Sequence, residues 1–508
     1  MDQVYSKASR VIIWLSPSPE TDPYLAVETL AELYNDLCKG IKYDRLTPDR
    51  YKRRQWNSLI QLLGHAWFRR TWTFQEAVLS SMKTDTPSGQ APLLERCLTV
   101  LYGTVSLPWA HLYVVARDLL QPEYRAVWSN VGAEVLAALE HIREIWHTRV
   151  RLVISNMCSL EYALMATRHR QATNARDAIY GLLGISTDAE GFGIEPDYSD
   201  TVESVYQRFA FAMICHAKSL RLLSFAGCGY PGSVYALPSW VPDWTCPPKC
   251  SPLSVTEGSR KYRATRFAAS CTLDSEITTA LSVKGVIFDK IEYLSSICTT
   301  STPNPELNEW LDEVESLVIR NNSRNTCDTQ LDLLGTPAFE NFCRTLTGNY
   351  ILENGELRNP SADSLRQKYL SCKSSCATRH GLEPSTRFCS SKRLDELAMP
   401  ESSPVMGPTV IFSNALEPTV GRRLCVTEAG RIGLIPPLSK QGDVLCVLLG
   451  AKVPFILRQS ENCQAGQGPQ DARLFKLVGE SYIHGAMGGE IAVSVDRGEM
   501  QYGSFLLQ

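Results

Sequence analysis

The sequence predicts an α/β fold for the first half of the chain and a mostly β unit at its C-terminal end. Residues 11–15 (VIIWL) form a continuous apolar run of strand length, which suits a strand buried on both faces. Asp22 and Pro23 then occupy the N-cap and first-turn positions of a helix, and a strand followed by a helix begins a layered α/β domain. After residue 408, short strand-like runs alternate with glycines, as in a small β-barrel or sandwich.

Helical and strand patterns alternate between these two regions. Asn174 and Gly184 bracket a short helix as its N-cap and C-terminal cap, and Asp200 with Glu203 forms the capping box of the next helix. The other elements expected in this region are a helix through Trp56 and Leu63, a strand over 98–102, helices from 107 and over 130–148, a strand over 281–289 and a helix over 305–320.

The predicted domain boundaries follow these changes of pattern. Residues 353–404 are rich in Ser, Pro, Arg and Lys and have little periodicity, which is typical of a poorly ordered segment. The expected parts are 1–150 as the first domain, 151–245 as its helical extension, 246–350 as a mixed α/β connecting segment, 351–407 as a poorly ordered linker and 408–508 as the C-terminal β unit.

Composition favours a cytoplasmic globular protein without a cofactor. The chain has 508 residues, 44% of them hydrophobic, and a net charge of −3, which indicates neither nucleic acid nor an anionic membrane as a partner. No secretory signal or transmembrane segment is visible, so the 17 scattered cysteines are interpreted as reduced thiols. The closer pairs Cys246/Cys250 and Cys372/Cys376 lie too far from each other in sequence to predict a metal site.

Common catalytic motifs are missing from the sequence. It contains no HExxH, GxSxG or P-loop motif, and no GxGxxG after a strand. Hydrolase, NTPase and dehydrogenase interpretations therefore lack their minimum residues.

Four sequence blocks resemble one known family. Residues 4–15 (VYSKASRVIIWL), 67–76 (WFRRTWTFQE) and 175–184 (ARDAIYGLLG) resemble, in this order, the IYxxAxxVxVWLG, WFxRxWxxQE and RDxIYxLLG patterns of the heterokaryon incompatibility (HET) domain of filamentous fungi. Residues 237–244 (LPSWVPDW) resemble the segment that follows that domain, and residues 408–508 resemble the C-terminal region of many such proteins. The matching motif residues are Tyr5, Ala8, Trp14, Leu15, Trp67, Arg70, Trp72, Gln75, Glu76, Arg176, Asp177, Tyr180, Trp240, Asp243 and Trp244.

The resemblance implies a role in non-self recognition and programmed cell death, but it does not supply a reaction. It also implies a TIR-like three-layer unit. Two earlier family blocks, YxALSYxWG and LWIDxxCINQ, are missing, so the expected α/β unit is incomplete in its N-terminal part. We expect the coding frame to continue upstream of Met1; the alternative is a decayed, inactive paralogue.

Trp72 and Glu76 are the strongest candidates for a chemical site. They lie one helical turn apart on one face, where a ring could stack on a nicotinamide or adenine and a carboxylate could reach a ribose hydroxyl. TIR domains that cleave NAD with a glutamate provide a fold-level analogy. The preferred interpretation is structural: Trp67, Phe68 and Trp72 form the aromatic core of a helix start, with Arg70 beside them.

Two other groups of polar residues are also interpreted as structural. Asp177 is expected to cap its helix while Arg176 pairs with a carboxylate elsewhere, for which Glu76 is a candidate. His484 and Glu490 flank a glycine-rich turn that could bind an anion or a metal, but a tight turn with a surface histidine is preferred.

Three functions remain open from the sequence. The preferred one is a non-enzymatic protein that induces death by association with a protein partner or with itself. The alternatives are an NAD- or nucleotide-cleaving TIR-like enzyme centred on Glu76, and an inactive remnant. Enzymatic activity is therefore uncertain and not favoured.

Overall fold

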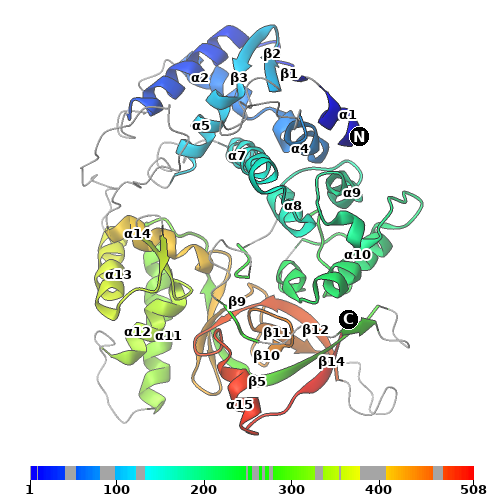
Figure 1. Ribbon diagram of the computed structural model, residues 1–508. Helices are drawn as coiled ribbons and strands as arrows, with labels where there is room; N and C mark the ends of the chain where they lie inside the picture. The colour runs from blue at the N-terminus through cyan, green and yellow to red at the C-terminus, as the bar shows by residue number, and fades with distance from the viewer. Residues whose placement is uncertain are drawn as a thin grey trace. The chain divides into compact units, whose positions relative to one another are not determined.

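The computed structural model describes residues 2–8, 10–40, 53–80, 98–121, 132–230, 232–246, 250–254, 262–265, 269, 271–273, 279–325, 336–353, 356–377, 408–460 and 473–508 (Figure 1). Contacts divide them into two compact units. The first contains the described residues of 1–199 and 244–246, and the second those of 200–243 and 250–508.

The first unit contains a three-stranded sheet. Strand β1 (Val11–Leu15) runs parallel to β2 (Leu98–Tyr102), and β2 pairs antiparallel with β3 (Val105–Pro108). Both parallel strands lie where the sequence predicts them. The sheet therefore combines one parallel and one antiparallel pairing.

Strand β1 is buried on one face only, so the prediction of a strand buried on both faces is wrong. Val11, Ile13 and Leu15 are buried, whereas Ile12 is 57% and Trp14 is 67% exposed. Successive side chains of a strand point to opposite faces, and the described residues cover only one of them here. The apolar run predicted the length of the strand correctly, but it did not indicate which face of the strand other residues cover.

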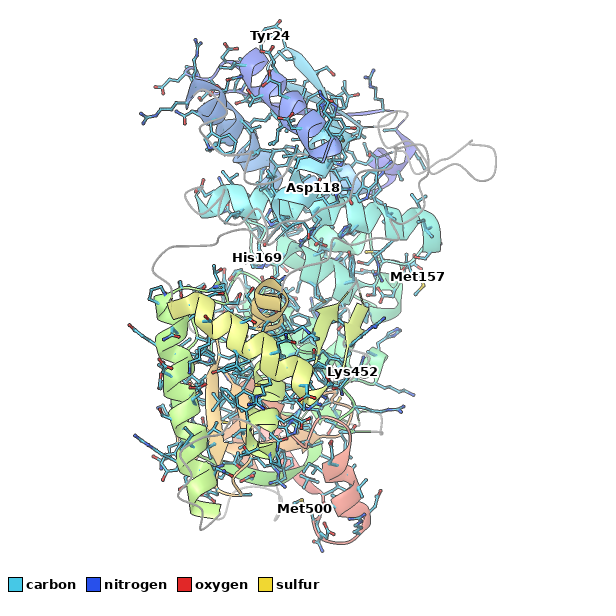
Figure 2. The ribbon with its side chains drawn as sticks, turned by 90° about the vertical axis from the view of Figure 1, so that its left-hand side faces the viewer. Tyr24, Asp118, Met157, His169, Lys452 and Met500 are labelled. Atoms are coloured by element: carbon cyan, nitrogen blue, oxygen red, sulfur yellow. The ribbon has the colours of Figure 1, made fainter. Side chains whose placement is uncertain are left out.

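Helices make up the rest of the first unit. Helix α2 begins as expected, because the Asp22 side chain accepts a hydrogen bond from the Leu25 backbone N–H at 3.2 Å. Its second residue, Tyr24, lies at the outer surface and is 69% exposed (Figure 2). The helices are α1 (Asp2–Lys7), α2 (Pro23–Cys38), α3 (Arg53–Leu63), η3 (Ala66–Arg69), α4 (Thr71–Val78), α5 (Trp109–Leu119), α7 (Ala133–Ser155), α8 (Leu160–Thr167), α9 (Asp177–Leu183) and η6 (Ala189–Phe192).

The second unit is built on a β-barrel, one of the two architectures expected for the C-terminal end. Strands pair in the order β10-β11-β12-β14-β5, and an additional pairing of β10 with β5 closes this series into a ring. Strand β5 is 17 residues long, and its second half leaves the ring to pair with β8. The strands are β4 (Cys271–Leu273), β5 (Leu281–Ile297), β8 (Arg423–Thr427), β9 (Ile432–Ile435), β10 (Val444–Leu448), β11 (Phe455–Gln459), β12 (Arg473–Glu480), β13 (Tyr482–Ile483) and β14 (Gly503–Leu507).

A helical cluster packs beside strands β8 and β9 in this unit (Figure 1). Its centre is aromatic, because the Tyr369 ring contacts the rings of Phe339, Phe342 and Phe412 edge-on. The cluster uses α11 (Pro305–Asn325), α12 (Pro337–Leu346), α13 (Ala362–Ala377) and α14 (Pro408–Ala415), with the hairpin of β6 (Ile351–Glu353) and β7 (Glu356–Arg358) beside them.

Helix α13 corrects the prediction of a poorly ordered linker over 351–407. Leu365, Tyr369, Cys372 and Cys376 are buried at helical spacing, whereas the polar residues between them lie on the other faces. A composition dominated by Ser, Lys and Arg concealed this single apolar stripe. Residues 378–407 lie outside the described residues.

Helix α10 (Val202–Ala217) begins the second unit, whereas the sequence predicted it as part of the helical extension 151–245. The expected capping box is also shifted. Thr201 is the N-cap and accepts a hydrogen bond from the Ser204 N–H, while Asp200 pairs with Arg208 at 2.7 Å.

Three further short helices complete the second unit: η7 (Arg221–Phe225), η9 (Glu417–Thr419) and α15 (Glu490–Asp496). Within the described residues, no helix is both long and apolar enough to cross a membrane.

Candidate functional site

The second sequence block forms the turn η3 and the start of helix α4. The side chain of His65 caps the turn by accepting a hydrogen bond from the Trp67 N–H at 3.1 Å. Phe68 is fully buried and meets the Trp67 ring edge-on, with centroids 5.4 Å apart. Thr73 donates to the carbonyl of Trp67 at 2.8 Å and so ties the turn to the helix. Of the three rings predicted to form an aromatic core, Phe68 is buried, whereas Trp67 and Trp72 are partly exposed.

The second and third blocks meet at Asp177. One carboxylate oxygen accepts a hydrogen bond from the indole N–H of Trp72 at 2.9 Å, and the other accepts from the Tyr198 hydroxyl at 2.7 Å. Tyr180 is buried, and its hydroxyl donates to the Asp197 carbonyl at 3.1 Å. Because Asp177 bridges an indole and a phenol, it joins α4 to α9 and to the segment that follows α9.

The Trp72 ring packs against Gly181, one turn along α9. A Cβ atom on that glycine would lie 3.7 Å from the ring and 3.3 Å from the Thr71 methyl group. The absent side chain thus lets α4 and α9 approach closely, which holds the indole beside Asp177.

Asp177 does not have the role that the sequence predicted. Both oxygens of Asp177 bind side chains, so Asp177 does not cap its helix. The Asn174 side chain lies before the helix, where it accepts from the Arg176 N–H at 3.1 Å and from the Arg176 guanidinium at 3.2 Å. Arg176 is the N-cap residue of α9, two positions after Asn174, which the sequence predicted for that position.

Glu76 connects the second block to the first. Its carboxylate accepts a hydrogen bond from the hydroxyl of Tyr5 in α1, and burial together with the charge of Glu76 raises the Tyr5 pKa above its ordinary value. Glu76 is partly buried, as is Trp72, while Gln75 between them is buried. The two candidate side chains thus have protein partners on two different helices.

The other motif residues of the first two blocks are divided between core and surface. Leu15 is fully buried and Ala8 is partly exposed. Trp14 projects from β1, and its indole donates to the carbonyl of Gly103 at 3.1 Å. Arg70 is exposed at the start of α4.

Two buried arginines support α4, and sequence reasoning missed both. Arg170 stacks over the Phe74 ring at 4.7 Å and donates to the carbonyl of Arg70 at 3.1 Å, and burial lowers its pKa to about 9. Arg149 donates to the carbonyl of Val78 at 3.1 Å at the other end of the helix. Arginines at these positions carry no local signal, since nothing nearby in sequence indicates that they are buried.

A buried histidine beside Arg170 predicts acid sensitivity. Burial, together with the positive charge of Arg170, lowers the pKa of His141 to about 2, so the folded unit keeps it neutral. The stability that this contributes is complete above the unfolded pKa, near 6.5, and is lost as the pH falls toward 2. Between pH 6 and 3 we expect the free energy of unfolding to fall about 1.4 kcal/mol per pH unit more steeply in the wild type than in His141→Leu.

Urea unfolding at a series of pH values measures this slope, and His216→Leu, at an exposed position, is the matched control. Equal slopes for the wild type and His141→Leu would contradict the buried, neutral imidazole.

A small pocket in the first unit lies beside the second and third blocks. Its lining residues are Thr71, Leu164, Thr167, Arg168, Arg170, Ala178 and Trp244. The Arg168 guanidinium lies 5.0 Å above the Trp244 ring, and Trp244 itself is buried. The pocket has room for about one water molecule, which is far too little for a nucleotide.

The remaining motif residues are structural parts of the second unit. Trp240 is fully buried and donates to the Thr279 carbonyl at 2.8 Å, and Asp243 accepts from the Ser233 hydroxyl at 2.8 Å. Their burial explains why this segment contains large aromatic residues.

His484 and Glu490 lie at a tight turn, but His484 is partly buried rather than at the surface. Glu490 accepts from the Gly488 N–H at 2.7 Å, and Gly485 has a φ of 78°. Burial and the charge of Arg344 lower the pKa of His484. Within the described residues, no cluster of three or more His, Cys, Asp or Glu side chains could hold a metal ion.

The second unit contains a buried ion pair that sequence reasoning did not single out. Arg422 and Glu480 are both fully buried, and their side chains meet at 2.6 Å. Glu480 also accepts from the Leu253 N–H at 2.6 Å, and Arg422 donates to the Ser251 carbonyl at 3.0 Å. The pair thus attaches strand β12 to the segment that contains residues 250–254.

Comparison with known proteins agrees with this two-part architecture. The family model described as "Heterokaryon incompatibility protein (HET)" matches residues 1–76, and the one described as "Het-6 beta-barrel domain" matches residues 390–502. A curated relative, "Heterokaryon incompatibility protein 6, OR allele" of Neurospora crassa, is 22% identical over 574 aligned residues, which cover 98% of this chain and 79% of the relative. No solved structure is significantly similar to the chain.

The fold and these matches define a class of protein in which a HET module is followed by a β-barrel module. The chain is a heterokaryon incompatibility (HET) domain protein. The resemblance noted in the sequence is therefore confirmed. The third block, at 175–184, lies outside the range that the HET model matches.

Proposed function

We propose that this protein acts in heterokaryon incompatibility by associating with another protein or with a second copy of itself, in the cytoplasm, and that this association leads to non-self recognition and cell death. The observation that carries the proposal is that the motif side chains form hydrogen bonds with one another and with neighbouring helices. Asp177 accepts hydrogen bonds from Trp72 and Tyr198, and Glu76 accepts one from Tyr5. These residues hold α1, α4 and α9 together, so they support a surface rather than converge on a substrate.

Electrostatic arguments also favour association over nucleotide cleavage. A catalytic carboxylate acts best when the site excludes water and the carboxylate points toward the reacting atom. Glu76 is only partly buried and binds a tyrosine, and the pocket beside Thr71 is the size of a water molecule. An association surface needs no such pocket, and exposed Ile12 and Trp14 provide apolar area on β1.

Expression of the full chain in fungal cells tests the proposal. We expect Glu76→Gln to kill cells as the wild type does, with cellular NAD unchanged, because glutamine still accepts a hydrogen bond from Tyr5. Its stability should fall by about 1 kcal/mol, the difference between a charged and a neutral hydrogen bond. Tyr5→Phe removes the donor of the same bond and is the matched control.

Two further results would decide the mechanism. Killing that varies with the genetic background of the host strain would support association, because the host then supplies the partner. NAD depletion by the wild type that Glu76→Gln abolishes without changing the melting curve would instead establish a nucleotide-cleaving enzyme.

A further inference from the structure

Two cysteines from distant parts of the sequence lie side by side in the second unit. The sulfur atoms of Cys215 and Cys271 are 3.9 Å apart, although the residues are 56 positions apart in the chain. Cys215 is in the last turn of α10, and Cys271 is the first residue of β4. Their separation in sequence concealed this pair, because the cysteines there look scattered and single.

Accessibility separates this pair from most of the other described thiols. Cys215 is exposed and Cys271 is partly exposed, so a small oxidant in solution can reach them. The Cys372 and Cys376 side chains also interact, but both are buried and belong to one helix. Burial raises the pKa of Cys158 and of Cys425 to about 12, which keeps these thiols unreactive.

We propose that Cys215 and Cys271 form a site of reversible disulfide formation that responds to peroxide. The two sulfur atoms need to approach from 3.9 Å to about 2.05 Å, which rotation about the side-chain bonds can supply. Disulfides in the cytosol are characteristically transient and redox-sensing.

The chemistry has two steps. The Cys215 thiolate attacks one oxygen of hydrogen peroxide, the O–O bond breaks, and sulfenic acid and hydroxide are formed; the hydroxide takes up the proton that the Cys215 thiol had released and becomes water. The Cys271 sulfur then attacks the sulfenic sulfur, an S–S bond forms, and the hydroxyl leaves as water with the Cys271 proton. The two thiols lose two electrons in total, and the peroxide gains them.

The order of the two steps follows from the environments. Burial and the neighbouring Cys215 raise the pKa of Cys271 to about 12, so Cys271 stays protonated at neutral pH. Cys215 is the more exposed sulfur and meets the oxidant first. Cys271 is thus suited to resolve the sulfenic acid rather than to form it.

The bond would fasten the edge of the sheet to α10. Strand β4 has only three residues, and it pairs with the start of β5 through Cys271 to Leu273. The Ala269 N–H already donates to the Lys218 carbonyl at 2.9 Å, so a backbone hydrogen bond already joins the end of α10 to the segment before β4 in the reduced protein. A covalent link there restricts the unfolded chain and should raise the melting temperature.

Oxidation of the purified full-length protein with hydrogen peroxide tests this assignment. We expect the intact mass to fall by two hydrogen atoms, a non-reducing digest to contain a crosslinked peptide that joins residues 215 and 271, and dithiothreitol to reverse both changes. Hydrogen exchange at 271–273 should slow on oxidation. Cys215→Ser and Cys271→Ser should each abolish the crosslink and the slower exchange, whereas Cys38→Ser, at a partly exposed thiol in the first unit, should leave both unchanged.

The same experiment can overturn the proposal. A crosslink that survives in Cys215→Ser, or complete oxidation of exposed thiols to sulfinic acid without any 215–271 peptide, would contradict it. Neither result would bear on association or cell killing, so the proposal for the function is tested separately.

Discussion

Replacing Glu480 with glutamine should lower the free energy of unfolding of the second unit by about 3–5 kcal/mol. The reason is that the substitution leaves the positive charge of Arg422 buried without its partner. Arg422 and Glu480 are both fully buried, and their side chains meet at 2.6 Å. Glutamine preserves the volume and can still accept from the Leu253 N–H, but it leaves a guanidinium without a counter-charge in a region that excludes water.

Chemical denaturation of the full chain, followed by hydrogen exchange in the barrel strands, measures this loss. Glu428→Gln is the matched control, since Glu428 lies 3.6 Å from Lys290 with both side chains about half exposed. A pair of that kind is worth less than about 1 kcal/mol. Equal effects of the two substitutions would show that water reaches the Arg422–Glu480 pair.

Replacing Trp72 with alanine should destabilise the first unit by about 3 kcal/mol, the lower end of the range for loss of a large aromatic ring, because this ring is partly buried. The ring packs on Gly181, and its N–H group binds Asp177 at 2.9 Å, so the substitution removes packing and leaves one carboxylate oxygen without its donor. Any killing activity should disappear because the unit unfolds.

Thermal and urea melts of Trp72→Ala test this expectation against Trp14→Ala. Trp14 is 67% exposed and makes one hydrogen bond, to the Gly103 carbonyl, so its loss should cost about 1 kcal/mol. Trp72→Phe separates the two contributions, because it keeps most of the ring and loses only the bond to Asp177. An unchanged melting temperature for Trp72→Ala would show that this partly buried ring belongs to a binding surface.

Local chemistry made much of the secondary structure predictable. The Asp22 cap, the helical stripe of α2 and the strand runs at 11–15 and 98–102 depend on residues within a few positions of one another. The same holds for the β runs after 408 and their glycines. Errors arose where two local patterns competed, as at Asp200 and Thr201, or where composition concealed a stripe, as in α13.

The sequence by itself determined the family and the order of its elements, and it favoured a structural over a catalytic interpretation of the aromatic block. Only the tertiary structure decided which partners those residues have. Trp72 meets Asp177 across 105 positions, Arg422 meets Glu480 across 58, and Cys215 meets Cys271 across 56. Local periodicity shows which face of an element is apolar, but burial and hydrogen bonding depend on which distant segment packs against that face, and no short window of sequence contains this information.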